Sequence, residues 1–163
     1  MIKKFLIVLT IIFSQHVMSA GVEVNLSVDI KRLTLDAALI ISKAAINACR
    51  VQGVQIGVVV VDRGGNVQVA MRDTLATDMT LTIAEQKAYA ALSFNSVTSK
   101  LTSQAKTALV ELDGLMLIGG GVPVQAGGHI YGAVGVSGAA KAEVDENCAE
   151  EGVKSVIEDL EME

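Results

Sequence analysis

A single histidine, His129, lies in the chain beyond residue 20, directly after a pair of glycines. A neutral imidazole is a common ligand of iron and other transition metals. Tyr89 and Tyr131 add phenolic oxygens, which can bind ferric iron as phenolates. The alternative for each is a structural role, as a solvated turn histidine or as a packed ring with its hydroxyl at the surface. Metal ligation in this chain therefore depends on very few side chains.

Arg72 and Lys87 are the candidate counter-charges for an anionic ligand. Ser137 and Gly138 come shortly before the last predicted helix, and free N–H groups at a helix N-terminus attract anions such as a carboxylate. Nine of the 15 glycines fall within residues 114–138, but no Gly-Lys-Ser/Thr follows them, so they do not form a P-loop. Tight turns and close strand packing are the alternative explanation for these glycines.

Familiar catalytic and metal patterns are missing from the sequence. A Ser-His-Asp triad would have only His129 as its base, and Ser137 lacks the glycine spacing of a nucleophile elbow. No His/Cys cluster has zinc spacing. Asp62 precedes Gly64 and Gly65, which is typical of a turn. The acidic residues of 143–151 could gather a hard cation loosely, and a solvated acidic face is the alternative.

Hydrophobic periodicity predicts the elements that position these side chains. Apolar residues recur three or four apart after Thr34, a suitable N-cap, up to Gly53, which predicts a helix. The β-branched run 54–61 and the run 67–71 flank a Gly-Gly-Asn turn, so they predict a hairpin. The first of these strands is apolar almost throughout, and we expect it to be buried on both faces.

The second half of the chain adds two helices, a shorter helical stretch and three strands. Residues 78–93 predict a helix with a small-residue face, and 97–109 a shorter helical stretch. Short strands are expected at 115–118, 122–124 and 130–136, with Pro123 at an edge position or a strand start. Residues 140–163 form an amphipathic helix with nine acids and two lysines. The order predicts an α+β fold, with a five-stranded antiparallel sheet flanked by the N- and C-terminal helices.

Composition excludes several classes of protein. Of the 163 residues, 51% are apolar and 3% aromatic, and the net charge is −5. Such a chain is too apolar for intrinsic disorder. It is also too acidic and too poor in aromatics for a nucleic-acid-binding protein. Two cysteines are too few for a disulfide-rich miniprotein.

Residues 1–20 have the layout of a secretory signal peptide. Lys3 and Lys4 precede an apolar run over 5–13, and small residues follow at Ser19 and Ala20. The run is too short for a transmembrane helix. We therefore expect cleavage near Ser19 or Ala20, a periplasmic or secreted protein, no stable membrane anchor, and one domain over 21–163. Without residues 1–20 the chain keeps 11 basic and 18 acidic residues, a charge of −7.

Several stretches together resemble the GlcG/HbpS-like family, also met as the C-terminal domain of PduO-type proteins. The resemblance covers about residues 33–157. It is carried by Leu33-Thr34-Leu35-Asp36-Ala37-Ala38, Val59-Val60-Val61-Asp62-Arg63-Gly64-Gly65-Asn66, Arg72, Lys87-Ala88, Gly119-Gly120-Gly121-Val122-Pro123-Val124, Ile130-Tyr131-Gly132-Ala133-Val134-Gly135-Val136-Ser137-Gly138, Asp145-Glu146-Asn147-Cys148-Ala149 and Gly152.

The resemblance implies a profilin-like α/β/α layer fold, a homo-oligomer and, as in several members, haem binding. Haem-binding members are associated with a histidine near the start of the domain, where this chain has none. His129 and Tyr131 are then the expected haem-binding residues, with Arg72 and Lys87 as counter-charges for the propionates. We expect an exported protein that binds a small anionic ligand, most simply haem, rather than an enzyme.

Two other functions stay open. Some relatives are encoded near glycolate metabolism genes, which favours an enzyme acting on a small carboxylate through Asp62, Arg72 and Lys87. The other is a structural oligomeric module without a pocket.

Cys49 and Cys148 lie on the apolar stripes of the first and last predicted helices. The family fold implies that these helices pack together, so the two cysteines could form a disulfide in an oxidising compartment. Two small buried thiols are the alternative.

Overall fold

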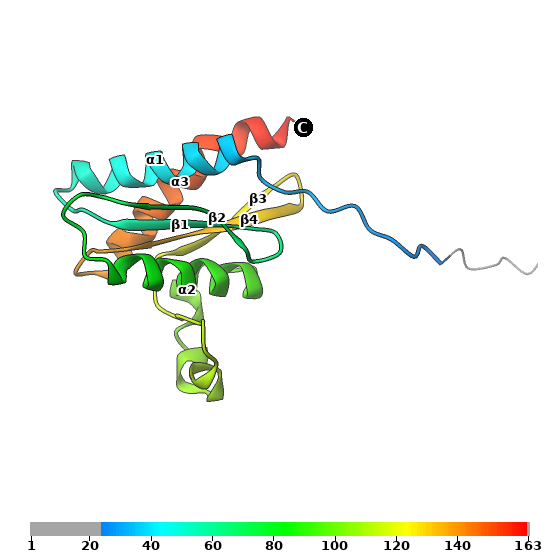
Figure 1. The fold of residues 1–163 in the computed structure, drawn as a ribbon. Coiled ribbons are helices and arrows are strands. Elements are labelled where there is room, and N and C mark those ends of the chain that lie inside the picture. Colours follow the sequence, from blue (N-terminus) through cyan, green and yellow to red (C-terminus); the bar gives the residue numbers. More distant parts are fainter. Residues whose placement is uncertain (1–23, 163) are drawn as a thin grey trace, which may run out of the picture.

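The computed structural model describes residues 24–162, which fold into three layers. Helices α1 (Leu35–Val51) and α3 (Ala142–Glu161) lie side by side on one face of a sheet, and α2 (Met79–Phe94) covers the other face (Figure 1). The predicted signal peptide lies outside the described residues. Within 24–162, no helix combines the length and apolarity that a membrane crossing requires.

The sheet is antiparallel, with strand order β2-β1-β4-β3. Its strands are β1 (Gly57–Asp62), β2 (Val67–Arg72), β3 (Gly121–Ala126) and β4 (His129–Ser137). All six residues of β1 are buried, which confirms the expected central strand. β3 pairs only with β4, so Pro123 does lie on an edge strand, where its missing N–H breaks no ladder.

The prediction of five strands is wrong: the sheet has four. Residues 115–118 form no strand, and their backbone polar groups bond elsewhere. Met116 N donates to Gln86 O of α2 at 3.4 Å, and Ile118 O accepts from Thr98 Oγ1 at 2.7 Å. These bonds tie the segment to α2 and to the turn before it, so it does not join the sheet.

The helical stretch expected at 97–109 is a chain of short 3₁₀ turns. Three of them, Thr98–Leu101, Gln104–Lys106 and Ala108–Glu111, form with residues 112–118 a lobe that projects from α2 on the side away from the sheet (Figure 1). The lobe is anchored by buried Leu101 and Leu117, which pack with Ala90 of α2. We call residues 98–118 the lobe.

Helix α2 approaches the sheet closely because both surfaces carry small residues. Ala84, Ala88 and Ala91 are fully buried against β1 and β4. At Gly135 of β4, a Cβ would lie 1.9 Å from the Ala84 carbonyl oxygen, so only glycine fits there. The small-residue face of the second helix and this glycine therefore share one cause, which is the short distance between α2 and the sheet.

A disulfide joins α1 to α3. Cys49 and Cys148 are both fully buried, and their Cα atoms lie 5.5 Å apart across 99 residues of sequence. The bond confirms that the first and last helices pack together. The disulfide therefore links the two helices, α1 and α3, that cover one face of the sheet.

Asp73, after β2, ties the end of α1 to the sheet. Arg50 Nε and Nη2 donate to its two carboxylate oxygens at 2.7 and 2.8 Å. This hydrogen-bonded ion pair holds the pKa of Asp73 at about 2. A carboxyl whose pKa is lower in the folded state stabilises the protein above its unfolded pKa of about 4.

We therefore expect stability to fall as the pH drops from about 4 to about 2, where Asp73 becomes protonated. Asp73→Asn should lower the stability above about pH 4 and flatten the profile between about pH 4 and about 2, because the variant has no carboxylate to protonate. Urea unfolding midpoints between pH 2 and 6 measure the difference. An unchanged acid slope in the variant would mean that other carboxylates dominate.

Candidate functional site

The residues expected to bind a ligand are spread over the molecule. Gly57 pairs with both Arg72 and Ser137, so Arg72 lies at the end of the sheet where β4 finishes. His129 begins β4 at the opposite end, on an exposed hairpin. Eight residues of strand separate His129 from Ser137, roughly 25 Å. His129 and Arg72 therefore do not share one site, and the Arg72 guanidinium donates to the Ala76 carbonyl instead.

Tyr131 lies in the core beneath α3. Its side chain belongs to the main apolar cluster, and the residue is 2% exposed. Its hydroxyl donates to the Leu160 carbonyl near the end of α3, at 3.4 Å. A ligand could reach this oxygen only if the end of α3 moved.

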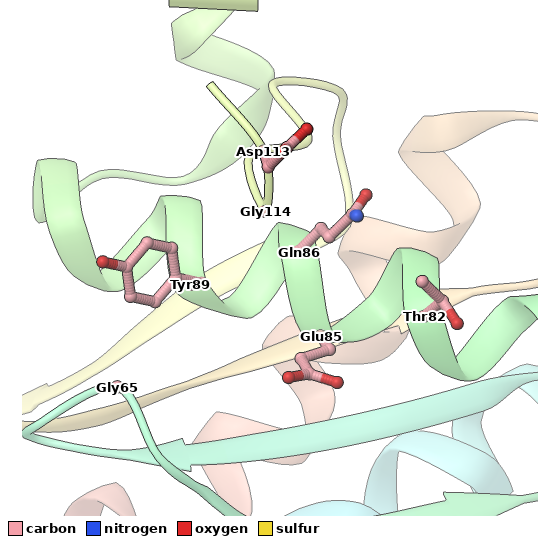
Figure 2. A pocket seen from close by; sticks show the side chains of 7 residues that line it. All are labelled: Gly65, Thr82, Glu85, Gln86, Tyr89, Asp113 and Gly114. Carbon is pink, nitrogen blue, oxygen red and sulfur yellow. The ribbon is translucent and has the colours of Figure 1, made fainter. Parts of the chain in front are cut away.

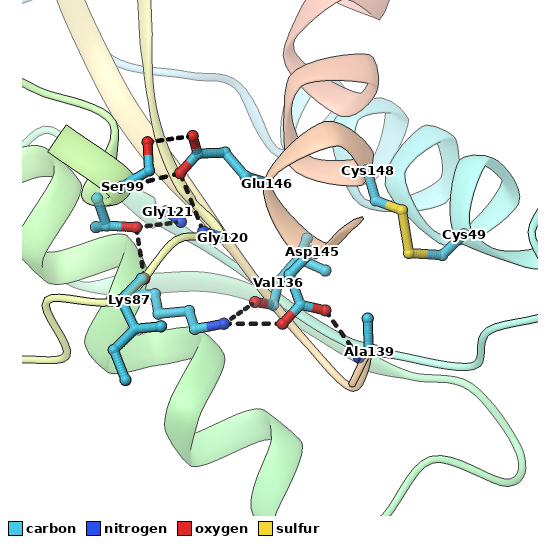
Figure 3. A network of polar contacts seen from close by, with 12 residues as sticks. Cys49, Lys87, Ser99, Gly120, Gly121, Val136, Ala139, Asp145, Glu146 and Cys148 are labelled. Atoms are coloured by element: carbon cyan, nitrogen blue, oxygen red, sulfur yellow. Dashed lines mark hydrogen bonds and ion pairs between the residues drawn. A yellow bond between two sulfur atoms is a disulfide. The ribbon is translucent and has the colours of Figure 1, made fainter. Parts of the chain in front are cut away.

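Lys87 of α2 is held in a buried ion pair (Figure 3). Its Nζ donates to Asp145 Oδ2 at 2.9 Å and to the Val136 carbonyl at 3.0 Å, and the Lys87 and Asp145 side chains are each 4% exposed. The charge of Lys87 is thus already balanced by a carboxylate of the protein itself.

The backbone donors near the start of α3 are occupied in the same way (Figure 3). Ala139 N donates to Asp145 Oδ1 at 2.9 Å, and Gly120 N donates to Glu146 Oε2 at 3.2 Å. Ser99 of the lobe also donates to Glu146, through its N–H and its hydroxyl. Ala139, directly after the Ser137-Gly138 pair proposed for an external carboxylate, therefore donates to a carboxylate of the protein itself, and the network ties α3 to α2, β4 and the lobe.

Asp62 closes the turn between β1 and β2. Its Oδ1 accepts from Gly64 N at 2.8 Å and from Asn66 N at 3.0 Å, and Arg32 lies 3.5 Å from its Oδ2. Burial alone would raise the pKa of Asp62, but the hydrogen bonds from Asn66 and Gly64, with the charge of Arg32, lower it. The expected role as a turn former is confirmed.

No cluster of metal-binding side chains is present among residues 24–162: nowhere do three or more His, Cys, Asp or Glu converge. The acids at the start of α3 instead bond the backbone and Lys87, as described above. A metal held by a cage of protein side chains therefore has no support in the described part of the chain.

A surface hollow lies on the outer face of α2, beside Tyr89 (Figure 2). The Tyr89 ring lies against the β1–β2 turn, where a Cβ on Gly65 would come within 2.9 Å of its Cε2. The residue is 43% exposed, and its hydroxyl makes no hydrogen bond to any described residue. A hollow of about 430 Å³ adjoins the ring, lined also by Thr82, Glu85, Gln86, Asp113 and Gly114.

A second, more apolar hollow lies on the other side of the same tyrosine. It measures about 340 Å³ and is lined by Tyr89, Ser93, Phe94, Leu109, Leu112, Asp113 and Leu115. Tyr89 and Asp113 border both hollows, so the two form one groove between α2 and the lobe, which we call the Tyr89 groove. The leucine-lined hollow can hold an apolar ligand. The free phenol beside it can bind a metal ion at the centre of that ligand.

Tyr89 was predicted as a possible phenolate ligand, but the sequence alone did not indicate a site around it. Glu85, Tyr89 and Ser93 are four residues apart, and they lie on the face of α2 opposite its buried alanines. That spacing places them in one exposed row. The other wall of the groove comes from the lobe, which was predicted as a helical stretch over 97–109 followed by a strand over 115–118.

Comparison with known proteins identifies the family. Residues 33–154 match the family model described as haem degrading protein HbpS-like. The chain belongs to the HbpS-like family. No curated protein sequence matches it.

Solved structures agree with this assignment. Protein ORFY of Klebsiella pneumoniae is 29% identical with a TM-score of 0.77, over 81% of this chain and 95% of its own. A double mutant of Streptomyces reticuli HbpS is 35% identical with a TM-score of 0.71, over 85% of this chain and 94% of its own. PduOC, solved as a haem complex, is 21% identical with a TM-score of 0.69, over 76% of this chain and 94% of its own, and this similarity concerns the fold alone.

Proposed function

We propose that this HbpS-like chain binds haem in the Tyr89 groove, with the Tyr89 phenolate as the axial ligand of ferric iron. The observation that carries the proposal is the exposed Tyr89 phenol, which has no hydrogen-bond partner among the described residues and lies beside an apolar hollow. The family description names haem, and PduOC, whose fold this chain shares, was solved with haem. Tyrosine is an established axial ligand of haem iron.

The size of the groove and its leucines support a porphyrin as the ligand. Each of its hollows, about 430 and about 340 Å³, falls in the size range of small-molecule sites. Leu109, Leu112 and Leu115 would contact the ring. Glu85 and Asp113 would repel the propionates, so the propionates should point toward solvent, away from those two carboxylates. Bound haem would supply an iron centre for redox or O₂ chemistry.

Haemin titration of the purified chain tests this proposal. We expect a saturable Soret shift at micromolar haemin, and Tyr89→Phe should weaken binding about tenfold or more, since it removes the bond to iron but keeps the ring. Tyr131→Phe is the matched control, because that hydroxyl is buried against Leu160, and it should leave the spectrum unchanged. No saturable shift in the wild type would reject haem as the ligand.

The His129→Ala variant tests whether His129, rather than Tyr89, binds the haem iron. His129 lies on the exposed β3–β4 hairpin and lines neither hollow of the groove. We expect its removal to leave the Soret band unchanged. Loss of the band in His129→Ala, with Tyr89→Phe unaffected, would move the proposed site to the hairpin.

An enzyme acting on a small carboxylate has no observation in its favour. It would need Asp62, Arg72 and Lys87 in one pocket. Asp62 closes the β1–β2 turn, Arg72 lies at the other end of β2, and Lys87 is paired inside the protein. The family description also names haem degradation, and binding is the step for which the described residues supply candidates.

Export belongs to the same proposal. We propose that residues 1–20 direct the chain out of the cytoplasm and are removed near Ser19 or Ala20, leaving a periplasmic or secreted protein. The Cys49–Cys148 disulfide supports this, because such bonds persist mainly in oxidising compartments. A secreted haem-binding domain would meet its ligand outside the cytoplasm.

A further inference from the structure

The segment before α1 runs extended, and its side chains are exposed in the described part of the chain, residues 24–162. Its large apolar side chains are exposed by 68% at Val24, 92% at Leu26, 80% at Val28 and 58% at Ile30. In Figure 1 this segment, drawn in blue, leaves the domain at the start of α1 and points away from the three layers. We call residues 24–31 the arm.

The arm has the pattern of a β-strand with one apolar face. Its four apolar residues alternate with Asn25, Ser27, Asp29 and Lys31. In an extended chain, alternate side chains point to opposite sides, so all four apolar groups share one side. A single strand has unpaired backbone groups as well as this apolar face, and both are satisfied when it joins a sheet.

The free edge of β2 is open to such a strand. β2 pairs only with β1, and it contains no proline. The other edge strand, β3, contains Pro123, which interrupts the row of donors. Of the two edges, β2 is therefore the one with a complete set of backbone groups.

A groove lies beside β2 on the side covered by α1. It measures about 260 Å³ and is lined by Lys43, Ile46, Asn47, Arg50 and Met71. Ile46 and Met71 both belong to the apolar side of this layer. A strand added next to β2 would place alternate side chains against them, as the apolar side of the arm requires.

We propose that the arm of one copy pairs with the β2 edge of a second copy and forms a fifth strand of that sheet. The arm's eight residues span about 26 Å, enough to cover the six residues of β2, about 20 Å. Reciprocal exchange of two arms would give a closed, symmetric dimer.

A second copy suits the arm better than its own β2 does. The base of the arm is fixed, because Arg32 pairs with Asp62 at 3.5 Å and Gln68 Nε2 donates to the Leu33 carbonyl at 3.0 Å. Pairing with its own β2 would require the chain to turn back at Arg32 and give up these contacts. Pairing with a second copy leaves them in place.

Two measurements on the purified chain test the arm. Sedimentation gives the mass as a function of concentration, and hydrogen exchange reports protection of the outward-facing β2 amides. We expect a dimer whose β2 protection rises with concentration. The double substitution Leu26→Asp/Val28→Asp should raise the dimer dissociation constant about tenfold or more, because it removes apolar burial at the new contact.

Leu75→Asp is the matched control. Leu75 is 79% exposed and lies in the loop after β2, outside the arm, so the dimer should persist. Three results would overturn the proposal. They are a monomer with an unprotected arm, arm protection that does not depend on concentration, as pairing with its own β2 would give, or a dimer that survives the double substitution unchanged.

Discussion

Replacing Lys87 with methionine should lower the free energy of unfolding by about 3–5 kcal/mol, because it leaves the Asp145 carboxylate buried without its cation. Both side chains are 4% exposed, so water cannot replace the lost partner without disturbing the fold. Methionine keeps most of the volume, which limits the contribution of a cavity. Urea unfolding at neutral pH measures the loss.

A double-mutant cycle separates the buried charge from other effects. Asp145→Asn keeps an acceptor for the Ala139 N–H but removes the charge, so Lys87→Met/Asp145→Asn should be less destabilised than the sum of the single changes. Lys154→Met is the control, since its pair with Glu151 is exposed and screened by solvent, so its loss should change the stability little. Additive losses in the cycle would mean that Lys87 acts mainly through packing.

Removal of the Cys49–Cys148 bond is the other change with a large expected effect. The bond closes a loop of 99 residues, and in the chain-entropy model a loop of that size contributes about 4–5 kcal/mol. Cys49→Ala/Cys148→Ala should therefore unfold at a much lower urea concentration than the wild type. Both cysteines are fully buried, so the comparison also includes a small packing loss.

Reductant provides the matched control for that prediction. It should lower the unfolding midpoint of the wild type toward that of the double variant, and it should leave the double variant unchanged. Alkylation followed by mass measurement should find no free thiol in the unreduced protein. Two alkylated cysteines in the unreduced protein would contradict the disulfide, and an unchanged midpoint in the variant would contradict its stabilising role.

The elements that periodicity predicted correctly are those whose own residues decide them. α1 begins after Thr34, whose hydroxyl accepts the Ala37 N–H at 3.2 Å, and it ends just before Gly53 at φ +73°. β1 is apolar as far as Val61 because helices cover both faces of the sheet. In each case the local pattern and the final packing agree.

The failures occurred where a long-range contact decides the structure. Residues 115–118 have the composition of a strand, but Gln86 and Thr98 take their backbone groups. Lys87 lies in the interior because Asp145, 58 residues later, balances its charge there. Spacing in one sequence reveals neither the contacts of residues 115–118 nor the Lys87–Asp145 pair. The prediction of a fifth strand was therefore wrong, and Lys87 was predicted to balance the charge of an external ligand.

One wall of the candidate site follows from local spacing, and the other depends on long-range packing. The row formed by Glu85, Tyr89 and Ser93 follows from helical spacing and could be predicted. The second wall depends on how the lobe folds against α2, through buried Leu101 and Leu117. A series of 3₁₀ turns has no strong periodicity, so the groove became visible only in the folded chain.

The position of bound haem decides whether the Tyr89 groove is the binding site. Ferric haem is paramagnetic and broadens the NMR signals of nearby groups, so amide spectra of the labelled chain with and without haemin will map its position. If haem binds in the Tyr89 groove, we expect broadening in α2 around Tyr89 and in the lobe at 109–115, with the signals of the β3–β4 hairpin retained. Broadening confined to the hairpin around His129, with the Tyr89 groove unaffected, would contradict it.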